Sequence, residues 1–429
     1  MADLSVGTKV HLTNGGTCTV KKELGRGGQG IVYLVDYNGK EYALKWYLSS
    51  YPDAFYSNIE RNAKAGSPSP SFLWPEAVTE REYGSFGYLM KLRPKGYEEV
   101  GAFMLAKVRF ASVDALLEAA LEICTSFQLM HIRGLSYQDL NDGNFFINPQ
   151  TGHVLICDND NVAPNGVNMG ILGKAGFMAP EIVEGDTLPN IYTDYFSLAV
   201  TLFILFYLNR PFDGAFALSC PCMNEAAEHK LNGRGEVFIM DPTNNSNRPV
   251  RGVHDNVIKR WGAFPKILQD EFIKTFSKEA ILTPQKRTMP RRWQDIIVQM
   301  RSLYVTCPVC GKKTFVNGET PCKCQDCDKL LSKPLIIKSG KYQIPLVPEQ
   351  KLYACQVSLE NDYDTVVGEV IRNKMDPKKW GLRNESKVTW TVMLPDGVTI
   401  KNIAPHEGMP AIPGCKIRFS KEVTAEICK

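Results

Sequence analysis

The stretch LSYQDLNDGNFFINPQTGHVLICDND, residues 135–160, decides how this chain is interpreted. It holds Asp139 and Asn144 five positions apart, and then an apolar run, VLIC, that ends in the triplet Asp-Asn-Asp at 158–160. A short apolar run bounded by turn residues is typical of a buried strand. Carboxylate and amide oxygens are the ligands that a hard cation such as Mg²⁺ prefers. The pattern therefore predicts a divalent-metal site where a loop meets the end of a strand.

A glycine-rich segment, LGRGGQGIVYLV, lies upstream between two predicted strands, and Lys45 follows in YALK, 15 residues after Gly30. The glycine spacing alone is weak evidence, because dinucleotide-binding folds use it too, but there it leads from a strand into a helix. Here it leads from strand to strand, which suits a flap over nucleotide phosphates. Glycine lets backbone N–H groups approach the phosphate oxygens, and Lys45 supplies a positive charge. The glycines expected in this flap are Gly25, Gly27, Gly28 and Gly30. The plainer alternative is a glycine-rich hairpin with a surface lysine.

The composition is that of a globular protein with several domains. A length of 429 residues corresponds to two to four domains at the usual size of about 100 to 200 residues. With 44% hydrophobic and 22% charged residues, the chain is not disordered, collagenous or a coiled coil. The net charge of +4 is not gathered in a single-sign block, so it does not indicate nucleic-acid binding.

We expect a cytoplasmic protein that does not cross a membrane. The N-terminus lacks the basic start and apolar core of a secretory signal, and the longest apolar run, residues 195–208, is shorter than a membrane span. That run is interpreted as a buried core helix.

Periodicity predicts a small β-rich lobe followed by a large helical lobe. Residues 18–46 alternate as an antiparallel meander with a hairpin turn at Asn38-Gly39, and residues 86–94 form another strand. Residues 52–65 have helical spacing, and helical patterns dominate from 112 to about 303. From about residue 336, short alternating strands return with turn signals between them, which is typical of a small all-β domain.

Cysteines are concentrated in the segment CPVCGKKTFVNGETPCKCQDC, residues 307–327. The pairs Cys307-x-x-Cys310 and Cys324-x-x-Cys327 have the spacing of a structural four-thiolate zinc site, in which no coordination position is left open for catalysis. Cys322 is an alternative ligand in place of Cys324. Zinc ribbons also bind nucleic acid, but this one has neither an aromatic stacking platform nor a dense arginine cluster, so nucleic acid is the less favoured partner.

Residues 18 to about 303 resemble a bacterial protein kinase of the eukaryotic-like (Hanks-type) Ser/Thr class. The markers occur in the order of that family: the glycine-rich loop, Lys45 in YALK, Asp139 and Asn144 in YQDLNDGN, Asp158 in CDND, MAPE at 178–181, Asp194 in DYFSLA, and Arg287 in PQKRT.

The resemblance implies ATP and Mg²⁺ (or Mn²⁺) as cofactors and a role for each marker. Asp139 would orient the substrate hydroxyl and accept its proton, while Asn144 and Asp158 would hold the metal, with Asp160 the runner-up to Asp158. Lys45 would contact the phosphates. The remaining expected residues are Glu60 as the ion-pair partner of Lys45, Val32 and Ala43 over the adenine base, and Met90 behind it.

Glu181 and Arg287 are expected to form a buried structural ion pair that braces the substrate-binding segment.

Four features depart from the family pattern. Tyr137-Gln138 replaces its His-Arg, and the segment 158–181 contains no Ser, Thr or Tyr, so we expect no switching through phosphorylation of this loop. Asn141 replaces the lysine that contacts the transferring phosphoryl group, and Lys174 is a candidate substitute for that charge, although a solvated lysine is the simpler interpretation. In the triplet 158–160, the polar residues Asn159 and Asp160 replace Phe-Gly.

Because Lys45, Asp139, Asn144 and Asp158 are all retained, we predict an active Ser/Thr protein kinase, a transferase. Two alternatives stay open. One is a nucleotide-binding pseudokinase scaffold that acts through its C-terminal module, and the other is a small-molecule kinase, since QDLNDGNFFI also resembles the loops of aminoglycoside and choline kinases.

The tail around GLRNES resembles forkhead-associated (FHA-like) β-sandwiches, although Arg383 and Ser386 do not make a full phosphopeptide-binding set. The whole arrangement resembles kinases of tellurite-resistance-type phosphorelays. That resemblance implies a von Willebrand A protein as substrate and a PP2C-type phosphatase as antagonist.

The predicted fold is α+β. It comprises a bilobal protein-kinase domain at 1–303 (N-lobe about 1–92, C-lobe about 93–303), a zinc ribbon at 304–335 and a β-sandwich at 336–429.

Overall fold

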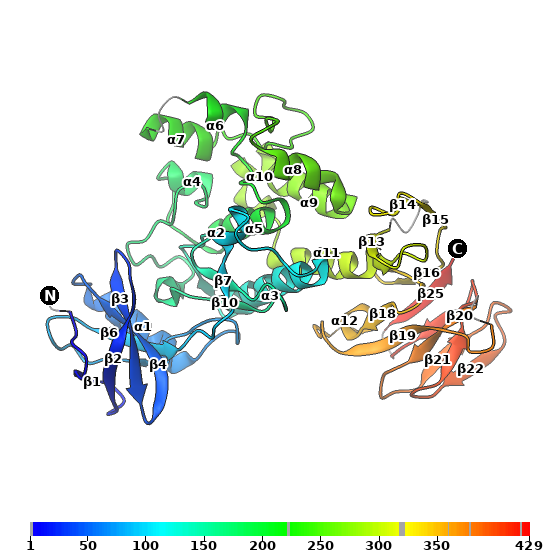
Figure 1. Ribbon diagram of the computed structural model, residues 1–429, viewed down its shortest axis with the longest axis horizontal. Helices are drawn as coiled ribbons and strands as arrows, with labels where there is room; N and C mark the ends of the chain where they lie inside the picture. The colour runs from blue at the N-terminus through cyan, green and yellow to red at the C-terminus, as the bar shows by residue number, and fades with distance from the viewer. Residues whose placement is uncertain (1–2, 221–223, 317–321, 359, 377–378, 421–422) are drawn as a thin grey trace. The chain divides into compact units, whose positions relative to one another are not determined.

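The computed structural model describes residues 3–220, 224–316, 322–358, 360–376, 379–420 and 423–429 (Figure 1). The chain divides into two compact units, which we describe separately. Unit 1 comprises residues 1–260 and 270–294, and unit 2 comprises residues 261–269 and 295–429. The division into three domains at 303 and 335 stays a prediction.

Unit 1 begins with a six-stranded sheet in the order β1-β2-β3-β4-β6-β5, drawn in blue in Figure 1. The meander expected over 18–46 is present, with an added edge strand, β1, before it. The turn between β3 and β4 has positive φ at both Asn38 (52°) and Gly39 (75°), as a tight hairpin requires. The strands are β1 (Lys9–His11), β2 (Thr17–Arg26), β3 (Gly30–Tyr37), β4 (Lys40–Tyr47), β5 (Ala77–Val78) and β6 (Gly87–Lys91).

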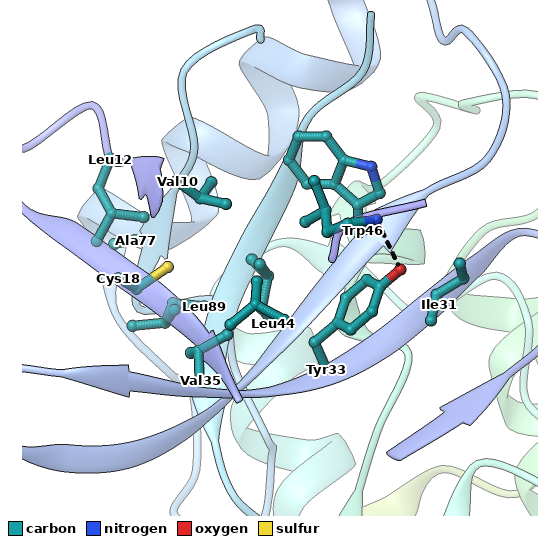
Figure 2. Close-up of a cluster of buried hydrophobic side chains, with 12 residues drawn as sticks. Val10, Leu12, Cys18, Ile31, Tyr33, Val35, Leu44, Trp46, Ala77 and Leu89 are labelled. Carbon is teal, nitrogen blue, oxygen red and sulfur yellow. Dashed lines mark hydrogen bonds between the residues drawn. The ribbon is translucent and has the colours of Figure 1, made fainter. Parts of the chain in front are cut away.

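Alternation along the strands gives this sheet two different faces. One face forms a wholly apolar cluster around Tyr33, Leu44, Trp46 and Leu89, shown in Figure 2. The N-terminal segment covers it, and the Tyr33 hydroxyl accepts a hydrogen bond from the Leu4 backbone N–H at 3.1 Å. The odd-numbered residues of β3 and the even-numbered residues of β4 point into this core. Because side chains alternate along a strand, the residues between them point to the opposite face.

The opposite face carries the functional positions. Ala43 and Tyr47 of β4 and Tyr88 and Met90 of β6 pack there, with Val32 partly buried beside them. Lys45 lies between Ala43 and Tyr47 in the alternation of β4 and is paired in register with Tyr88. The sheet therefore delivers one lysine into an otherwise apolar and aromatic surface.

Helix α1 (Asp53–Ala65) packs on this same face. Pro52 precedes its first turn, and Gly66, at φ 73°, ends it, as the sequence predicted. Its buried side chains are Phe55, Asn58, Ile59 and Asn62.

The rest of unit 1 is mainly helical, as predicted. Its short strands are β7 (Glu98–Glu99), β8 (Leu135–Ser136), β9 (Phe145–Ile147), β10 (Val154–Ile156) and β11 (Ala163–Pro164). Its helices, two of which continue into unit 2, are α2 (Val100–Met104), α3 (Val113–Ile132), α4 (Pro180–Val183), α5 (Ile191–Tyr207), α6 (Ala215–Ser219), α7 (Glu225–Asn232), α8 (Asp255–Arg260), α9 (Lys266–Thr275), α10 (Lys278–Leu282) and α11 (Pro290–Leu303). Three-residue 3₁₀ turns lie at Asn159–Asn161 and Pro284–Lys286, and a third, Trp261–Ala263, belongs to unit 2.

Helix α5 is the central core helix of this part, as expected for the apolar run 195–208. Every residue from Thr193 to Tyr207 is buried, and Asn190 caps its N-terminus through a side-chain bond to the backbone N–H of Tyr192 (2.9 Å). Within the described residues, α3 alone is long and apolar enough to span a membrane, but 61% of it is buried inside the structure. A core helix of a folded domain passes the same test.

A buried ion pair ties α4 to the segment before α11. The two terminal guanidinium nitrogens of Arg287 donate to the Glu181 carboxylate, at 2.7 and 2.6 Å. The Arg287 side chain is 0% exposed and that of Glu181 is 9% exposed. This is the structural pair that the sequence indicated.

Unit 2 contains two small hairpins and two larger antiparallel sheets. The larger sheets have the orders β17-β16-β25-β24-β21-β22 and β18-β19-β20-β23. Trp390 of β21 lies against Gly368 of β19, where an added Cβ would come within 3.1 Å of the indole, so the two sheets meet at a glycine. The elements are β12 (Tyr304–Thr306), β13 (Lys313–Phe315), β14 (Cys322–Lys323), β15 (Leu330–Leu331), β16 (Ile336–Ser339), β17 (Tyr342–Pro345), β18 (Lys351–Tyr353), α12 (Ala354–Val357), β19 (Val366–Arg372), β20 (Trp380–Asn384), β21 (Trp390–Met393), β22 (Ile400–Ile403), β23 (Gly408–Pro410), β24 (Lys416–Arg418) and β25 (Thr424–Cys428).

Replacing Arg287 by Met should destabilise unit 1 strongly, because it leaves the Glu181 carboxylate buried without its partner. We expect a loss of about 3–5 kcal/mol in the free energy of unfolding, measured by urea denaturation followed through tryptophan fluorescence. The matched control is Lys286→Met, since the Lys286–Glu279 pair is exposed (54% and 66%) and should contribute at most about 1 kcal/mol. Equal effects of the two substitutions would contradict the structural role of the buried pair.

Candidate active site and cysteine cluster

A cavity of about 710 Å³ lies between the sheet of unit 1 and its helical part. It brings together all but one of the predicted nucleotide and metal residues, from segments far apart in the sequence. These are Gly25, Gly27, Gly28, Gly30, Val32, Ala43, Lys45, Met90, Asp139, Asn144 and Asp158. Leu73, Phe146 and Cys157 also line it, and nothing in their local sequence pattern singled them out.

The glycine-rich segment forms the turn between β2 and β3 at the edge of this cavity. The backbone N–H of Gly27 donates to the carbonyl of Gly30 at 2.9 Å, which closes the turn. Gly30 is required by space, because a Cβ there would lie 2.6 Å from the backbone oxygen of Trp46. Gly25 and Gly28 have open space around them, so they leave the backbone accessible to a ligand.

Lys45 is 5% exposed and is paired with two carboxylates from the triplet 158–160. Its Nζ donates to Asp160 at 2.8 and 3.1 Å and to Asp158 at 3.1 Å. Burial alone would lower the pKa of Lys45, but the charges of Asp160 and Asp158 outweigh burial and raise that pKa above its ordinary value. The lysine is therefore a fixed positive charge at the wall of the cavity.

The prediction that Glu60 pairs with Lys45 is wrong in this structure. Lys45 bonds to Asp158 and Asp160 instead, and Glu60 does not line the cavity. Helix α1 turns Asn58 and Asn62 inward, and Glu60 lies about 200° around the helix from either of them. Helical periodicity could have indicated this, because position 60 lies nearly on the opposite side of the helix from the buried positions 58 and 62.

Asp158 and Asp160 have different environments, and this distinguishes their roles. The Asp158 side chain is 44% exposed and lines the cavity, whereas that of Asp160 is 0% exposed and does not line it. Asp158 also has a left-handed backbone (φ 54°, ψ 44°), which is unusual outside glycine and fixes the side chain at the end of the strand. Asp158 is thus the carboxylate that a cation in the cavity can reach.

Three amide side chains surround Asp139. The Nδ2 of Asn144 donates to the Asp139 carbonyl at 2.7 Å, which leaves its Oδ1 as the atom available to a cation. Asn141 donates to Asp139 Oδ1 at 3.2 Å, and Asn161 donates to Oδ2 at 3.3 Å. The sequence did not identify Asn161, whose position just after the triplet gave no distinct signal. Oxygen donors from Asn144 and Asp158 fit a Mg²⁺ ion.

Burial raises the pKa of Asp139 to about 6. The hydrogen bond from Asn141 opposes this shift, and the charges of Asp158 and Asp160 add to it. A carboxyl group with this pKa is a usable proton acceptor near neutral pH.

Asp194, in the first turn of α5, forms hydrogen bonds with the backbone of the loop that carries Asp139. The Asp194 carboxylate accepts the backbone N–H groups of Tyr137 (2.8 Å) and Gln138 (3.2 Å) and bonds the His131 ring (3.0 Å). Tyr137 in turn donates its hydroxyl to the carbonyl of Cys157. The loop is therefore fixed both to α5 and to Cys157, which lies between β10 and Asp158.

Asn159 stands where the related kinases have an apolar phenylalanine, and it forms hydrogen bonds there instead. It is fully buried, and its Nδ2 donates to the carbonyls of Leu73 (2.8 Å) and Ile156 (2.9 Å).

Lys174 reaches the same loop as Asp139, where its Nζ contacts Asp142 Oδ1 at 2.5 Å. Lys174 does not line the cavity, whereas Asn141 does. The structure therefore does not show Lys174 supplying the positive charge that the family places at position 141.

In unit 2, four cysteine sulfurs gather within 4.8 Å of one another, those of Cys307, Cys310, Cys324 and Cys327. Cys307 and Cys327 are 3.9 Å apart and Cys310 and Cys324 are 3.7 Å apart. A tetrahedral zinc site with Zn–S bonds of about 2.3 Å requires sulfur separations of about 3.8 Å. The Sγ of Cys322 is instead directed at the carbonyl of Phe315 (3.9 Å). The donor set thus fits zinc, and it uses Cys324.

The two cysteine turns have the same backbone geometry. Cys307 N–H donates to Lys312 O and Gly311 N–H to Cys307 O, and the same pattern runs from Cys324 to Lys329 (2.8–3.0 Å). Both turns need positive φ at the fifth position, supplied by Gly311 (75°) and Asp328 (55°). Backbone N–H groups of Cys327 and Asp326 lower the pKa of Cys324 to about 6, whereas the neighbouring thiols raise the pKa of Cys310 and of Cys327.

In the C-terminal sheets, the candidate phosphopeptide residues are engaged within the domain. Arg383 contacts the carboxylates of Glu369 (2.6 Å) and Glu385. The Ser386 hydroxyl contacts Asn384 Oδ1 at 2.7 Å. These contacts satisfy both side chains without a ligand.

Comparison with known proteins agrees with the geometry of the cavity. Residues 97–246 match the family described as Protein kinase domain. The mouse protein kinase C delta type is 26% identical over 206 residues, which is 46% of this chain and 30% of that protein. Protein kinase YegI of Escherichia coli K12 is 27% identical over 230 residues, covering 49% of this chain and 35% of that protein. YegI of E. coli O157:H7 is 27% identical over 343 residues, covering 73% of this chain and 49% of that protein.

Residues 97–246 are therefore similar to a protein kinase domain, and the proteins that match parts of the chain include some named as serine/threonine-protein kinases. The chain spans about half or less of the length of these curated relatives.

The raised pKa of Asp139 can be measured directly. We expect its carboxyl group to titrate near pH 6 in the ¹³C NMR spectrum of protein labelled at aspartate, assigned with Asp139→Asn. The Asp158→Asn substitution should lower this pKa, because it removes one of the negative charges that raise it. Titration near pH 4 in the wild-type protein would contradict the burial argument.

Proposed function

We propose that this protein is an ATP- and Mg²⁺-dependent Ser/Thr protein kinase that transfers the γ-phosphoryl group to a protein hydroxyl. The observation that carries the proposal is the single cavity lined by the glycine-rich turn, Lys45, Asp139, Asn144 and Asp158. Phosphoryl transfer depends mainly on positioning and charge neutralisation, and this is the minimal set of groups for both.

Each group has a task that matches its environment. Asn144 and Asp158 would hold Mg²⁺, which neutralises charge on the phosphates. The buried ammonium of Lys45 would bind phosphate oxygens beneath the glycine-rich turn. Asp139, partly buried and hydrogen-bonded by Asn141 and Asn161, would orient the acceptor hydroxyl and take its proton. The apolar residues Val32, Ala43 and Met90 line the same cavity and suit the adenine base.

A protein substrate is favoured over a small molecule by the braced segment 178–194. The Glu181–Arg287 pair braces one end of this segment, and at its other end Asp194 accepts the backbone N–H groups of the two residues before Asp139. A small-molecule kinase has no need for such a braced segment, and a pseudokinase scaffold has no need for a complete set of metal and proton-acceptor groups.

The loop after Asp158 has contacts that support activity without loop phosphorylation. Gln138, at φ 71°, donates its side-chain N–H to the carbonyl of Val167 at 2.5 Å and accepts from Asn168 at 3.2 Å. Asn168 also donates to the carbonyl of Ile171 at 2.5 Å. Amide side chains thus hold this loop at the place where the family uses an arginine and a phosphate.

The test is incubation of the purified full-length chain with Mg²⁺ and γ-labelled ATP, with Asp139→Ala and Asp158→Ala beside it. We expect label on the wild-type protein or on an added protein substrate, and a loss of about 100-fold or more in both variants. Mass spectrometry should place any autophosphorylation outside residues 158–181. Tight binding of Mg·ATP without transfer to any added protein would favour the scaffold instead.

We further propose that Cys307, Cys310, Cys324 and Cys327 bind one structural Zn²⁺ in a ribbon, and that the β-strands from 336 form an FHA-like β-sandwich. The two identical cysteine turns and the sulfur spacing support the zinc site. The six- and four-stranded sheets meeting at Trp390 and Gly368 support a sandwich. Phosphopeptide binding is not included, since Arg383 and Ser386 are engaged internally.

The zinc proposal predicts about one zinc per chain by plasma mass spectrometry. Cys324→Ser should lose the metal and destabilise unit 2, because a structural zinc site contributes directly to folding. Cys322→Ser is the matched control and should keep the metal. Retention of zinc in Cys324→Ser with loss in Cys322→Ser would reverse the ligand assignment.

By resemblance alone, we propose a cytoplasmic location, a von Willebrand A protein as substrate and a PP2C-type phosphatase as antagonist in a bacterial phosphorelay. Addition of such a candidate substrate to the labelling experiment tests the first of these partners.

A further inference from the structure

Asp160 occupies a cage built by one face of the N-terminal sheet. Its Oδ2 accepts from Lys45 Nζ at 2.8 Å and from the Tyr47 hydroxyl at 2.5 Å. Its Oδ1 accepts from Lys45 at 3.1 Å and lies 3.5 Å from the Tyr88 hydroxyl. Lys45 and Tyr47 are two positions apart on β4, and Tyr88 is the register partner of Lys45 on β6. All three side chains therefore converge on a single carboxylate.

The cage is dry, and it matches a carboxylate rather than a metal. Asp160, Tyr88 and Tyr47 are each 0% exposed. Burial first, and then the charge of Asp160, raise the pKa of Tyr47 and of Tyr88 well above the ordinary value, so both hydroxyls stay protonated as donors. With its oxygens engaged by Lys45 and Tyr47, Asp160 is not placed to coordinate an ion in the cavity.

Helix α1 does not provide the carboxylate that Lys45 requires. Its buried polar side chains are the amides of Asn58 and Asn62, which both donate to the carbonyl of Val162, at 2.9 and 2.8 Å. The helix is thus fixed to the backbone just after the triplet, whereas Lys45 bonds to Asp158 and Asp160. An almost fully buried ammonium group must still be paired, because an unpaired one is strongly disfavoured.

We propose that Asp160 is the positioning residue that holds Lys45 toward the nucleotide phosphates, in place of a carboxylate on helix α1. Asp158 remains the metal ligand, so the two aspartates of the triplet divide the work between lysine positioning and metal binding. Because Lys45 lies on β4 and Asp160 lies in the loop after β10, their hydrogen bonds involve no residue of α1. This inference rests on the proposed function, in which Lys45 meets the phosphates.

The experiment compares binding of Mg·ATP and of adenosine to the full-length protein by isothermal titration calorimetry. Asp160→Asn keeps the shape of the side chain and removes its charge. We expect it to weaken Mg·ATP binding about tenfold or more, since a positioned charged hydrogen bond is lost, and to leave adenosine binding within about twofold of wild type. Glu60→Gln is the matched control and should leave both affinities within about twofold.

Two further readouts separate positioning from other roles. In phosphoryl transfer, Asp160→Asn should lower kcat without moving the Mg²⁺ concentration that gives half-maximal rate, whereas Asp158→Asn should raise that concentration. If Asp160→Asn does not fold, Tyr47→Phe keeps both charges and removes one donor to Asp160. That variant should then weaken Mg·ATP binding relative to adenosine in the same direction.

Mg·ATP binding within about twofold of wild type in Asp160→Asn would overturn the inference. The inference would also be overturned if Asp160→Asn weakened the binding of Mg·ATP and of adenosine equally. It would be overturned as well if Glu60→Gln lost as much Mg·ATP affinity as Asp160→Asn. A wild-type protein that binds Mg·ATP but transfers no phosphoryl group would defeat the proposed function, and the binding comparison would still decide the role of Asp160. A wild-type protein that binds no Mg·ATP would overturn both.

Discussion

Lys45 lies on the inner face of a sheet, where it is almost completely buried, and a buried ammonium group is stable only if it is paired. Much of unit 1 follows from meeting that need. The apolar cluster on the other face fixes the alternation of β4, so Lys45 has no route to solvent on that side (Figure 2). The pairing brings residues 158–160 against the sheet, more than 110 positions further along the chain. One buried ion-pair cluster thus joins the sheet to the loop that borders the cavity.

Amide side chains make many of the contacts that hold the loops of the candidate site. Asn159 bonds two backbone carbonyls in a fully buried position, and Asn161 and Asn141 both donate to Asp139. Gln138 and Asn168 hold the loop beyond Val162. Amides can do this at any pH and without phosphate, since they carry donors and acceptors but no charge. In this structure these amide contacts hold the loop without any phosphate group.

Sequence reasoning worked well where a local pattern carries the physics. Asn38-Gly39 predicted a hairpin because its turn requires positive φ at both residues, and Gly66 ended a helix for a similar reason. The spacing of Asp139 and Asn144 brings both to one loop, because five residues of a tight turn cannot separate them far. The cysteine pairs were recognisable because each turn of four residues directs two sulfurs at one point. Glu60 was misassigned because the helix was identified correctly but its rotational phase was not.

By itself, the sequence determined the kinase-like order of motifs, the strand-turn-strand context of the glycines and the candidate zinc ligands, because each depends on residues close together in the chain. Only the tertiary structure decided which carboxylate pairs with Lys45, which aspartate faces the cavity, and that Asn161 reaches Asp139. Those outcomes depend on which side chains are buried together. The side chains concerned come from β4, β6 and the loop after β10, which are far apart in the sequence. Desolvation is a property of the packed fold, so no local pattern could distinguish Asp158 from Asp160 or exclude Glu60.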